Sequence, residues 1–279
     1  MFEYDFMRTA FLAGGVVAVV AGAVGFFLVL RNLTFAGHAL SHVGFAGATG
    51  AVLVGVDALW GLLAFTVAAA LAMGLLGERL RNRDVAVGIV LSLALGLGVL
   101  FLYLYTTSAA EATAILFGNL LGVSLATLWS LCGLSLATLA ALGALSRPLL
   151  FATVAPELAE AKGVSLRLVS MLFLAIVAVA VAEAAQVVGV LLVFALMVGP
   201  AAAAQRLSPR LGRGVALAVL LALGETWGGI ALAYASDWPT TFWIVMLSSL
   251  VYFASFLPSS ISQALKVGGV AQARAGDAP

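Results

Sequence analysis

Long apolar runs, separated by short polar segments, occupy most of this chain. A helix needs about 20 apolar residues to cross a hydrocarbon core of about 30 Å, and in lipid only a helix or a closed barrel satisfies its own backbone hydrogen bonds. The runs are long and uniform rather than short and alternating, so they predict helices and an all-α polytopic transmembrane bundle of eight or nine spans. The nine candidate spans are residues 9–30, 38–56, 58–76, 85–106, 124–145, 168–186, 187–205, 212–235 and 239–257.

Two segments interrupt the regular pattern. The sixth and seventh spans form one unbroken apolar stretch of nearly twice the length a span needs, so we expect a turn near residues 186–189. Residues 107–122 are too polar at their start and too short to cross the bilayer. Irregular backbone at membrane depth must be buried in protein or line a cavity. This segment is therefore either re-entrant or interfacial, or it is a plain outer loop.

The basic residues predict the orientation of the bundle, because short cytoplasmic loops are enriched in Lys and Arg. With nine alternating spans, all of the 13 Lys and Arg residues except Arg8 fall on one side. The opposite side holds Asp57, Glu111 and Asp237. We expect the N-terminus outside and the C-terminus inside.

Composition supports a single membrane domain. Hydrophobic residues make up 64% of the chain and charged residues only 9%, whereas about a quarter of a soluble domain is charged. We expect one permease-like domain over residues 1–279, with a cytoplasmic loop at 146–167 and a cytoplasmic tail at 258–279. A net charge of +1 without a basic tract argues against a nucleic-acid partner, and the single Cys132 forms no disulfide framework.

Both histidines of the chain lie four residues apart, at the start of the second span. Residues at i and i+4 share one helix face, so His38 and His42 can present their imidazoles to one metal ion. Alternatively, each makes an interhelical hydrogen bond. In a homodimer with a two-fold axis near this face, four imidazoles would form a ligand set suited to zinc and poorly suited to magnesium, calcium or manganese.

Glu183 and Glu225 are the acids that lie deep in predicted spans. Ionisable side chains at membrane depth face a cavity, a partner or an ion path rather than lipid. Each is therefore either a carboxyl hydrogen-bonded between helices or a station on an ion path.

The cytoplasmic loop contains a short predicted helix. Pro156 and Glu157 suit a helix start, while Lys162 and Gly163 suit its end. A surface helix on the basic side of a membrane protein is either a docking element or a plain connector.

Together these residues resemble the ABC-3 family of permease subunits, which import zinc, manganese or iron in bacteria. The resemblance rests on LRNLTFAGHALSH at residues 30–42, LFG at 116–118, AEAKG at 159–163, VGVLLV at 188–193 and PAA at 200–202. It implies a type II importer-like helical bundle in the bacterial inner membrane, working as a homodimer with two cytoplasmic ATP-binding subunits and an external metal-binding protein.

The resemblance also assigns roles to residues. It makes residues 156–163 the coupling helix on the ATPase, with Pro156, Glu157, Ala159, Ala161 and Gly163 as its coupling residues. The family pattern Gly-Asp-x-x-x-His becomes Gly37-His38 followed by His42 here, so an imidazole replaces the acid and the sequence favours zinc. Glu183 and Glu225 match no family position that we can assign.

The chain has no Gly-x-x-x-x-Gly-Lys-Ser/Thr loop, and neither of its two lysines fits one. We therefore expect no enzyme and no permanently bound cofactor, but the permease of an ATP-driven zinc importer, or of a manganese or iron importer of the same family. A proton-coupled cation transporter using the two buried acids is a further alternative. An intramembrane metallohydrolase ranks last, because no Glu follows His38 as general base.

Overall fold

The computed structural model describes residues 4–79, 83–104 and 116–257, and within them every regular element is a helix. Nine of these helices have 15 residues or more, and each corresponds to one predicted span. They are α1 (Asp5–Leu30), α2 (Thr34–Leu53), α3 (Ala58–Arg79), α4 (Arg83–Leu104), α6 (Leu125–Val154), α8 (Leu166–Val188), α9 (Val193–Leu207), α10 (Leu211–Ser236) and α11 (Thr240–Ala254). Two short elements complete the set, the 3-10 turn η1 (Leu120–Gly122) and α7 (Pro156–Ala161).

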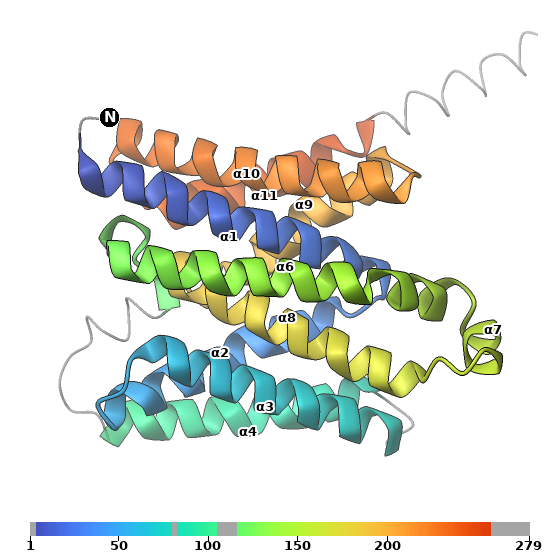
Figure 1. Cartoon of the computed structure of the whole chain (residues 1–279). Coiled ribbons are helices and arrows are strands. Elements are labelled where there is room, and N and C mark those ends of the chain that lie inside the picture. The colour runs from blue at the N-terminus through green and yellow to red at the C-terminus, as the bar shows by residue number, and fades with distance from the viewer. Residues whose placement is uncertain (1–3, 80–82, 105–115, 258–279) are drawn as a thin grey trace, which may run out of the picture.

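The helices lie side by side along a common direction (Figure 1). Six of those in the described residues are long and apolar enough to cross a bilayer: α1, α3, α4, α6, α8 and α10. Helices α9 and α11 have 15 residues each, or about 22 Å. The transmembrane helical bundle is thus confirmed, with two spans shorter than a full hydrocarbon core.

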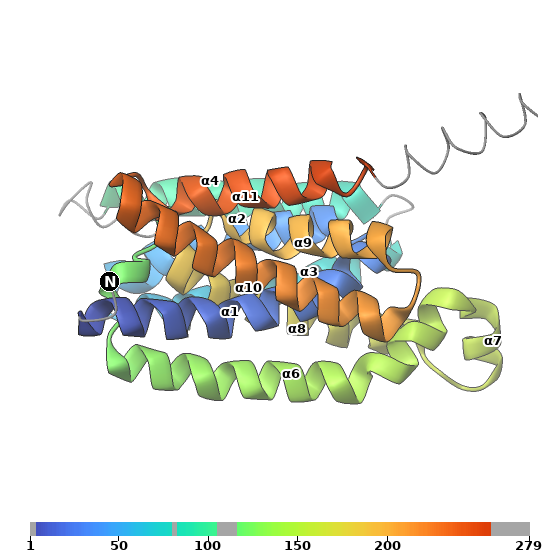
Figure 2. The same ribbon diagram turned by 90° about the horizontal axis from the view of Figure 1, so that it is seen from above.

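Successive helices run in opposite directions, so the two ends of the bundle collect different loops (Figures 1 and 2). The N-terminus lies at one end and α7 projects from the other. Arg31 follows α1 and Arg206 lies in the last turn of α9, and both helices run toward the α7 end. Lys162 follows α7 itself. Asp57 and Asp237 lie in loops at the N-terminal end of the bundle. The alternation agrees with the predicted separation of charge, and its direction across the membrane stays a prediction.

Small residues let the helices approach closely. A Cβ added at Gly22 of α1 would meet the backbone of Val219 in α10, and one at Gly25 would meet the backbone of Met197 in α9. Gly47 of α2 and Gly61 of α3 face each other in the same way. Because lipid tails are as apolar as leucine, such van der Waals contact between backbones is a main source of helix association in a membrane.

Helix α6 differs from the prediction at its C-terminal end. The predicted span ends at residue 145, but the helix continues through Pro148 to Val154. Proline removes only one backbone hydrogen bond, that to the carbonyl four residues earlier, and Leu149 and Ala152 beyond it are buried. Their packing keeps the last turns helical, so the first part of the loop at 146–167 is helix.

The predicted turn near residues 186–189 is confirmed. Helix α8 ends at Val188, and Gly189 has a positive φ of 84°, a conformation that a side chain would disfavour. Gly118, also at positive φ, packs on the Gly189 backbone, and the Leu191 N–H donates to the Leu116 carbonyl at 3.2 Å. The described part of the segment at 107–122 is therefore held against the start of α9.

Several predicted features lie outside the described residues. These are residues 107–115 with Glu111, Arg81, and the tail at 258–279 with Lys266 and Arg274.

Candidate functional site

The two histidines lie together on the first turns of α2. The ring centroids of His38 and His42 are 4.6 Å apart, with the rings nearly perpendicular at 87°. The hydroxyl of Ser41, between them in sequence, donates to the His38 carbonyl at 2.7 Å. The backbone thus occupies this hydroxyl, and the imidazoles are the groups of this turn that remain available to a ligand.

Phe194, at the start of α9, covers His38 from the side. The two ring centroids are 4.9 Å apart at an angle of 72°. The Nδ1 atom of His38 is buried without a hydrogen-bond partner among the described residues. A ligand approaching His38 would therefore meet Nε2 before the buried Nδ1.

The histidine pair alone offers too few ligands for a complete metal site. No group of three or more His, Cys, Asp or Glu side chains in the described residues lies close enough to hold a metal ion. Structural and catalytic zinc sites use four or three protein ligands. One chain thus offers two imidazoles. Further ligands to a metal ion here would have to come from a second chain, from water or from another protein.

Glu183 of α8 is fully buried and makes two hydrogen bonds to α6. The Ser135 hydroxyl donates to Glu183 Oε2 at 2.5 Å, and the Thr138 hydroxyl donates to Oε1 at 2.6 Å. The structure thus has the interhelical hydrogen bonds that were one of the two expectations for this acid. Sequence reasoning missed the two partners, although their i, i+3 spacing in an apolar span signals one polar face.

Glu225 of α10 has a different environment. It is only 2% exposed, and neither of its carboxylate oxygens has a hydrogen-bond partner among the described residues. The nearby Ser248 hydroxyl of α11 donates instead to the Ala195 carbonyl of α9 at 3.0 Å. A buried polar group without a partner is costly, so a role for Glu225 on an ion path remains a prediction with a physical motive.

The predicted coupling helix forms at α7, and Gly163 after it has a φ of 83°. Pro156, Glu157, Ala161 and Gly163 are exposed, whereas Ala159 is fully buried and anchors the helix. Leu158 is 54% exposed although it is apolar. Sequence reasoning did not single out Leu158, which lies on the helix that projects from the bundle, and a docking role for α7 stays a prediction.

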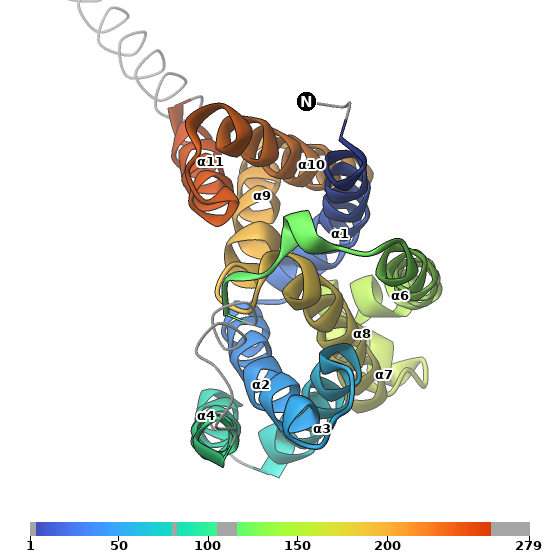
Figure 3. The ribbon, with the colours of Figure 1, turned by 90° about the vertical axis from the view of Figure 1, so that its left-hand side faces the viewer.

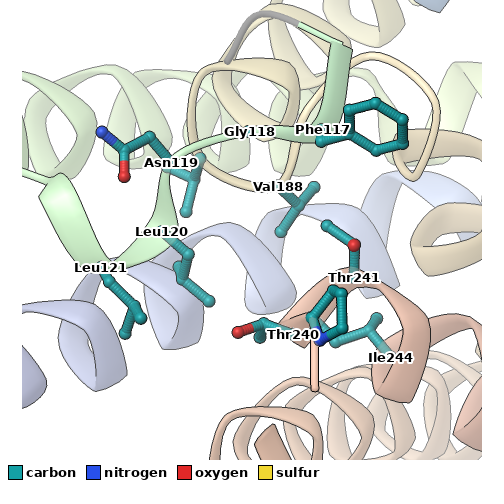
Figure 4. A pocket seen from close by; sticks show the side chains of 11 residues that line it. Phe117, Gly118, Asn119, Leu120, Leu121, Val188, Thr240, Thr241 and Ile244 are labelled. Atoms are coloured by element: carbon teal, nitrogen blue, oxygen red, sulfur yellow. The ribbon is translucent and has the colours of Figure 1, made fainter. Parts of the chain in front are cut away.

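A cavity of about 200 Å³ lies at the opposite end, between the segment at 117–121 and the start of α11 (Figure 4). Phe117, Thr240, Thr241 and Ile244 are among its lining residues, and Asn119 points away from its centre. No His, Asp or Glu lines it, so it lacks the ligands of a transition-metal site.

Comparisons with known proteins cover nearly the whole chain. The family model of the ABC 3 transport family matches residues 3–259. The manganese transport system membrane protein MntC of Listeria innocua is 27% identical over 258 residues, covering 92% of each protein. The manganese import system permease protein ScaB of Streptococcus gordonii is 28% identical over 265 residues, covering 95% of each.

A solved structure supports the same assignment. The chain matches a chain of PsaBC from Streptococcus pneumoniae in complex with Fab at a TM-score of 0.82, with 27% identity and coverage of 91% of this chain and 92% of that one. The chain therefore belongs to the ABC 3 transport family, as a multi-pass permease of a bacterial inner membrane.

Proposed function

We propose that this permease carries a divalent transition-metal ion into the cell in an ATP-driven importer, and that manganese is its first candidate cargo. The observation that carries the proposal is the full-length similarity to relatives named as manganese transport and manganese import proteins. The sequence alone favoured zinc, and the names of the relatives favour the alternative.

Zinc remains a second candidate because of the donor set. His38 and His42 are nitrogen ligands, and no acid of the described residues joins them in a metal-binding group. Imidazole suits zinc, whereas manganese prefers carboxylate, carbonyl and water oxygens. A manganese ion held here would need oxygen ligands from outside the pair.

The partners follow from the same reasoning. The exposed surface of α7 would dock on a cytoplasmic ATP-binding subunit. That subunit would supply the energy for transport, because this chain has no phosphate-binding loop with which to hydrolyse ATP. A second copy of the chain would bring two more imidazoles to the first pair. An external metal-binding protein would deliver the ion at the end opposite α7.

The test is metal uptake by cells that express the permease with its ATPase and binding protein, with manganese and zinc supplied together. Wild type should accumulate the cargo metal, and His42→Ala should lower uptake at least about tenfold. Losing even a residue that hydrogen-bonds to a metal ligand lowers metal affinity or activity by about that factor, and losing the ligand itself should lower it no less. Inductively coupled plasma mass spectrometry identifies which metal accumulates.

Ser41→Ala is the matched control. It changes the neighbouring residue of the same turn, whose hydroxyl contacts only its own backbone, and should leave uptake unchanged. Wild-type uptake in His42→Ala, with the protein present in the membrane, would remove the histidine pair from the pathway. Uptake by the isolated permease under a pH gradient, without the ATPase, would contradict the ATP-driven mechanism.

A further inference from the structure

The imidazole of His38 makes two ring contacts. Its centroid lies 4.6 Å from that of His42 and 4.9 Å from that of Phe194. Both contacts are edge-to-face, with interplanar angles of 87° and 72°. Such a contact sets the positive edge of one ring on the negative face of the other, so it favours one relative orientation of the two rings. The two contacts therefore restrict the rotation of the His38 ring.

The Nδ1 atom of the same ring is buried and has no hydrogen-bond partner among the described residues. A histidine that binds a metal ion through one ring nitrogen ordinarily donates the other ring N–H to a carboxylate, a carbonyl or a water molecule. This outer hydrogen bond fixes the orientation of the ring. Because the Nδ1 atom of His38 makes none within the described part of the chain, the orientation of the ring depends on its two ring contacts.

Phe194 is the contact that comes from another helix. His42 lies on α2 together with His38, whereas Phe194 lies in the first turn of α9. Helix α9 packs between α2 on one side and the pair α10 and α11 on the other, as the end view shows (Figure 3). Phe194 thus ties the His38 ring to a second helix of the bundle.

The first turn of α9 is itself fixed on both sides of Phe194. Before it, the Leu191 N–H donates to the Leu116 carbonyl at 3.2 Å. After it, the Ala195 carbonyl accepts a hydrogen bond from the Ser248 hydroxyl of α11 at 3.0 Å. A side chain on a backbone held in this way can set the orientation of the group that it contacts.

We propose that Phe194 is a positioning residue of the metal site, which holds the His38 ring in the orientation in which His38 and His42 bind one ion. This inference rests on the proposed role of the histidine pair in transport. The aromatic contact takes the place of the outer hydrogen bond. That bond would also make the imidazole more basic, which an aromatic contact does not. The pair is thus oriented without holding the ion tightly, as release into the cell requires.

Zinc binding to the purified permease–ATPase complex tests the proposal, by competition with a chelating dye. Zn²⁺ is the probe because imidazole suits it. The zinc bound at the pair is the difference between wild type and His38→Ala/His42→Ala. Phe194→Leu keeps an apolar side chain but loses the ring. It should weaken this binding about threefold to tenfold, the contribution of one aromatic contact, and leave the number of sites unchanged.

Two further variants separate positioning from general damage. Phe194→Tyr keeps the ring and should bind zinc as wild type does. Phe101→Leu is the matched control, because Phe101 of α4 makes an edge-to-face contact with Phe65 of α3, at 6.2 Å and 83°, rather than with a histidine. It should also bind zinc as wild type does. Wild-type affinity in Phe194→Leu, or an equal loss of affinity in Phe101→Leu, would overturn the proposal.

A second measurement needs neither metal nor transport. The chain contains only two histidines, so histidine-selective labelling gives nuclear magnetic resonance signals from His38 and His42 alone. Phe194→Leu should shift the His38 ring signals, because they lose the ring current of Phe194, and unchanged signals would overturn the proposal. Phe194→Met gives the same comparison if Phe194→Leu does not accumulate in the membrane.

Failure of this inference is distinguishable from failure of the proposed function. Zinc binding that is lost in His38→Ala/His42→Ala but unchanged in Phe194→Leu would overturn only the role of Phe194. Equal zinc binding by wild type and His38→Ala/His42→Ala would overturn the metal site itself, and the role of Phe194 with it.

Discussion

At the scale of single residues, the two buried acids differ in what surrounds them. Glu183 accepts two hydrogen bonds from α6, whereas Glu225 has no partner among the described residues. We expect Glu183→Leu to lower the free energy of unfolding by about 1 to 2 kcal/mol, because two buried hydroxyls lose their acceptor. Denaturant unfolding of the purified permease measures this loss.

The triple variant Ser135→Ala/Thr138→Val/Glu183→Leu is the matched control, because it removes the whole polar cluster. Replacing all partners of a buried hydrogen bond by apolar groups of similar shape is nearly neutral, so stability should recover. If the triple variant is stable and still takes up metal, Glu183 is structural. If it is stable but inactive, Glu183 lies on the ion path.

At the scale of elements, α7 is a helix of six residues that projects from one end of the bundle. Ala159 anchors it and Leu158 faces outward. We expect Leu158→Glu to weaken binding of the proposed ATP-binding subunit about thirtyfold or more, because it would bury an unpaired charge at the centre of the contact. Co-purification of tagged permease with the ATPase checks this expectation.

Leu121→Glu makes the same change on an exposed leucine at the opposite end of the bundle. It should co-purify with the ATPase as wild type does. Full ATPase binding by Leu158→Glu would show that α7 is a connector rather than a docking helix.

At the scale of the whole molecule, one chain brings together too few metal-binding side chains for a complete metal site in the described residues. It provides two imidazoles, with no third metal-binding side chain grouped with them in the described residues. We expect a dimer to bind one metal ion with ligands from both chains. In a dimer of one wild-type and one His38→Ala/His42→Ala chain, isolated through two different tags, metal bound per dimer should fall well below half of the wild-type value. Half of the wild-type amount would instead indicate one independent site per chain.

The sequence alone was sufficient for features that depend on neighbours along the chain. Apolar runs of bilayer length predicted the nine long helices, and the i, i+4 spacing placed His38 and His42 on one face. Pro156 and Gly163 marked the limits of α7, because proline favours a first turn and glycine tolerates the positive φ that ends a helix. The sequence pattern favoured zinc, and only the names of the relatives favour manganese as the cargo.

Only the tertiary structure decided which distant residues meet. Phe194 lies on His38, Ser135 and Thr138 bind Glu183, and the Gly118 backbone packs on Gly189. Nothing in the local pattern specifies these pairs, because in an almost uniformly apolar chain many helix arrangements satisfy hydropathy equally well. Close packing and buried hydrogen bonds select among those arrangements, and both require the helices to be in place.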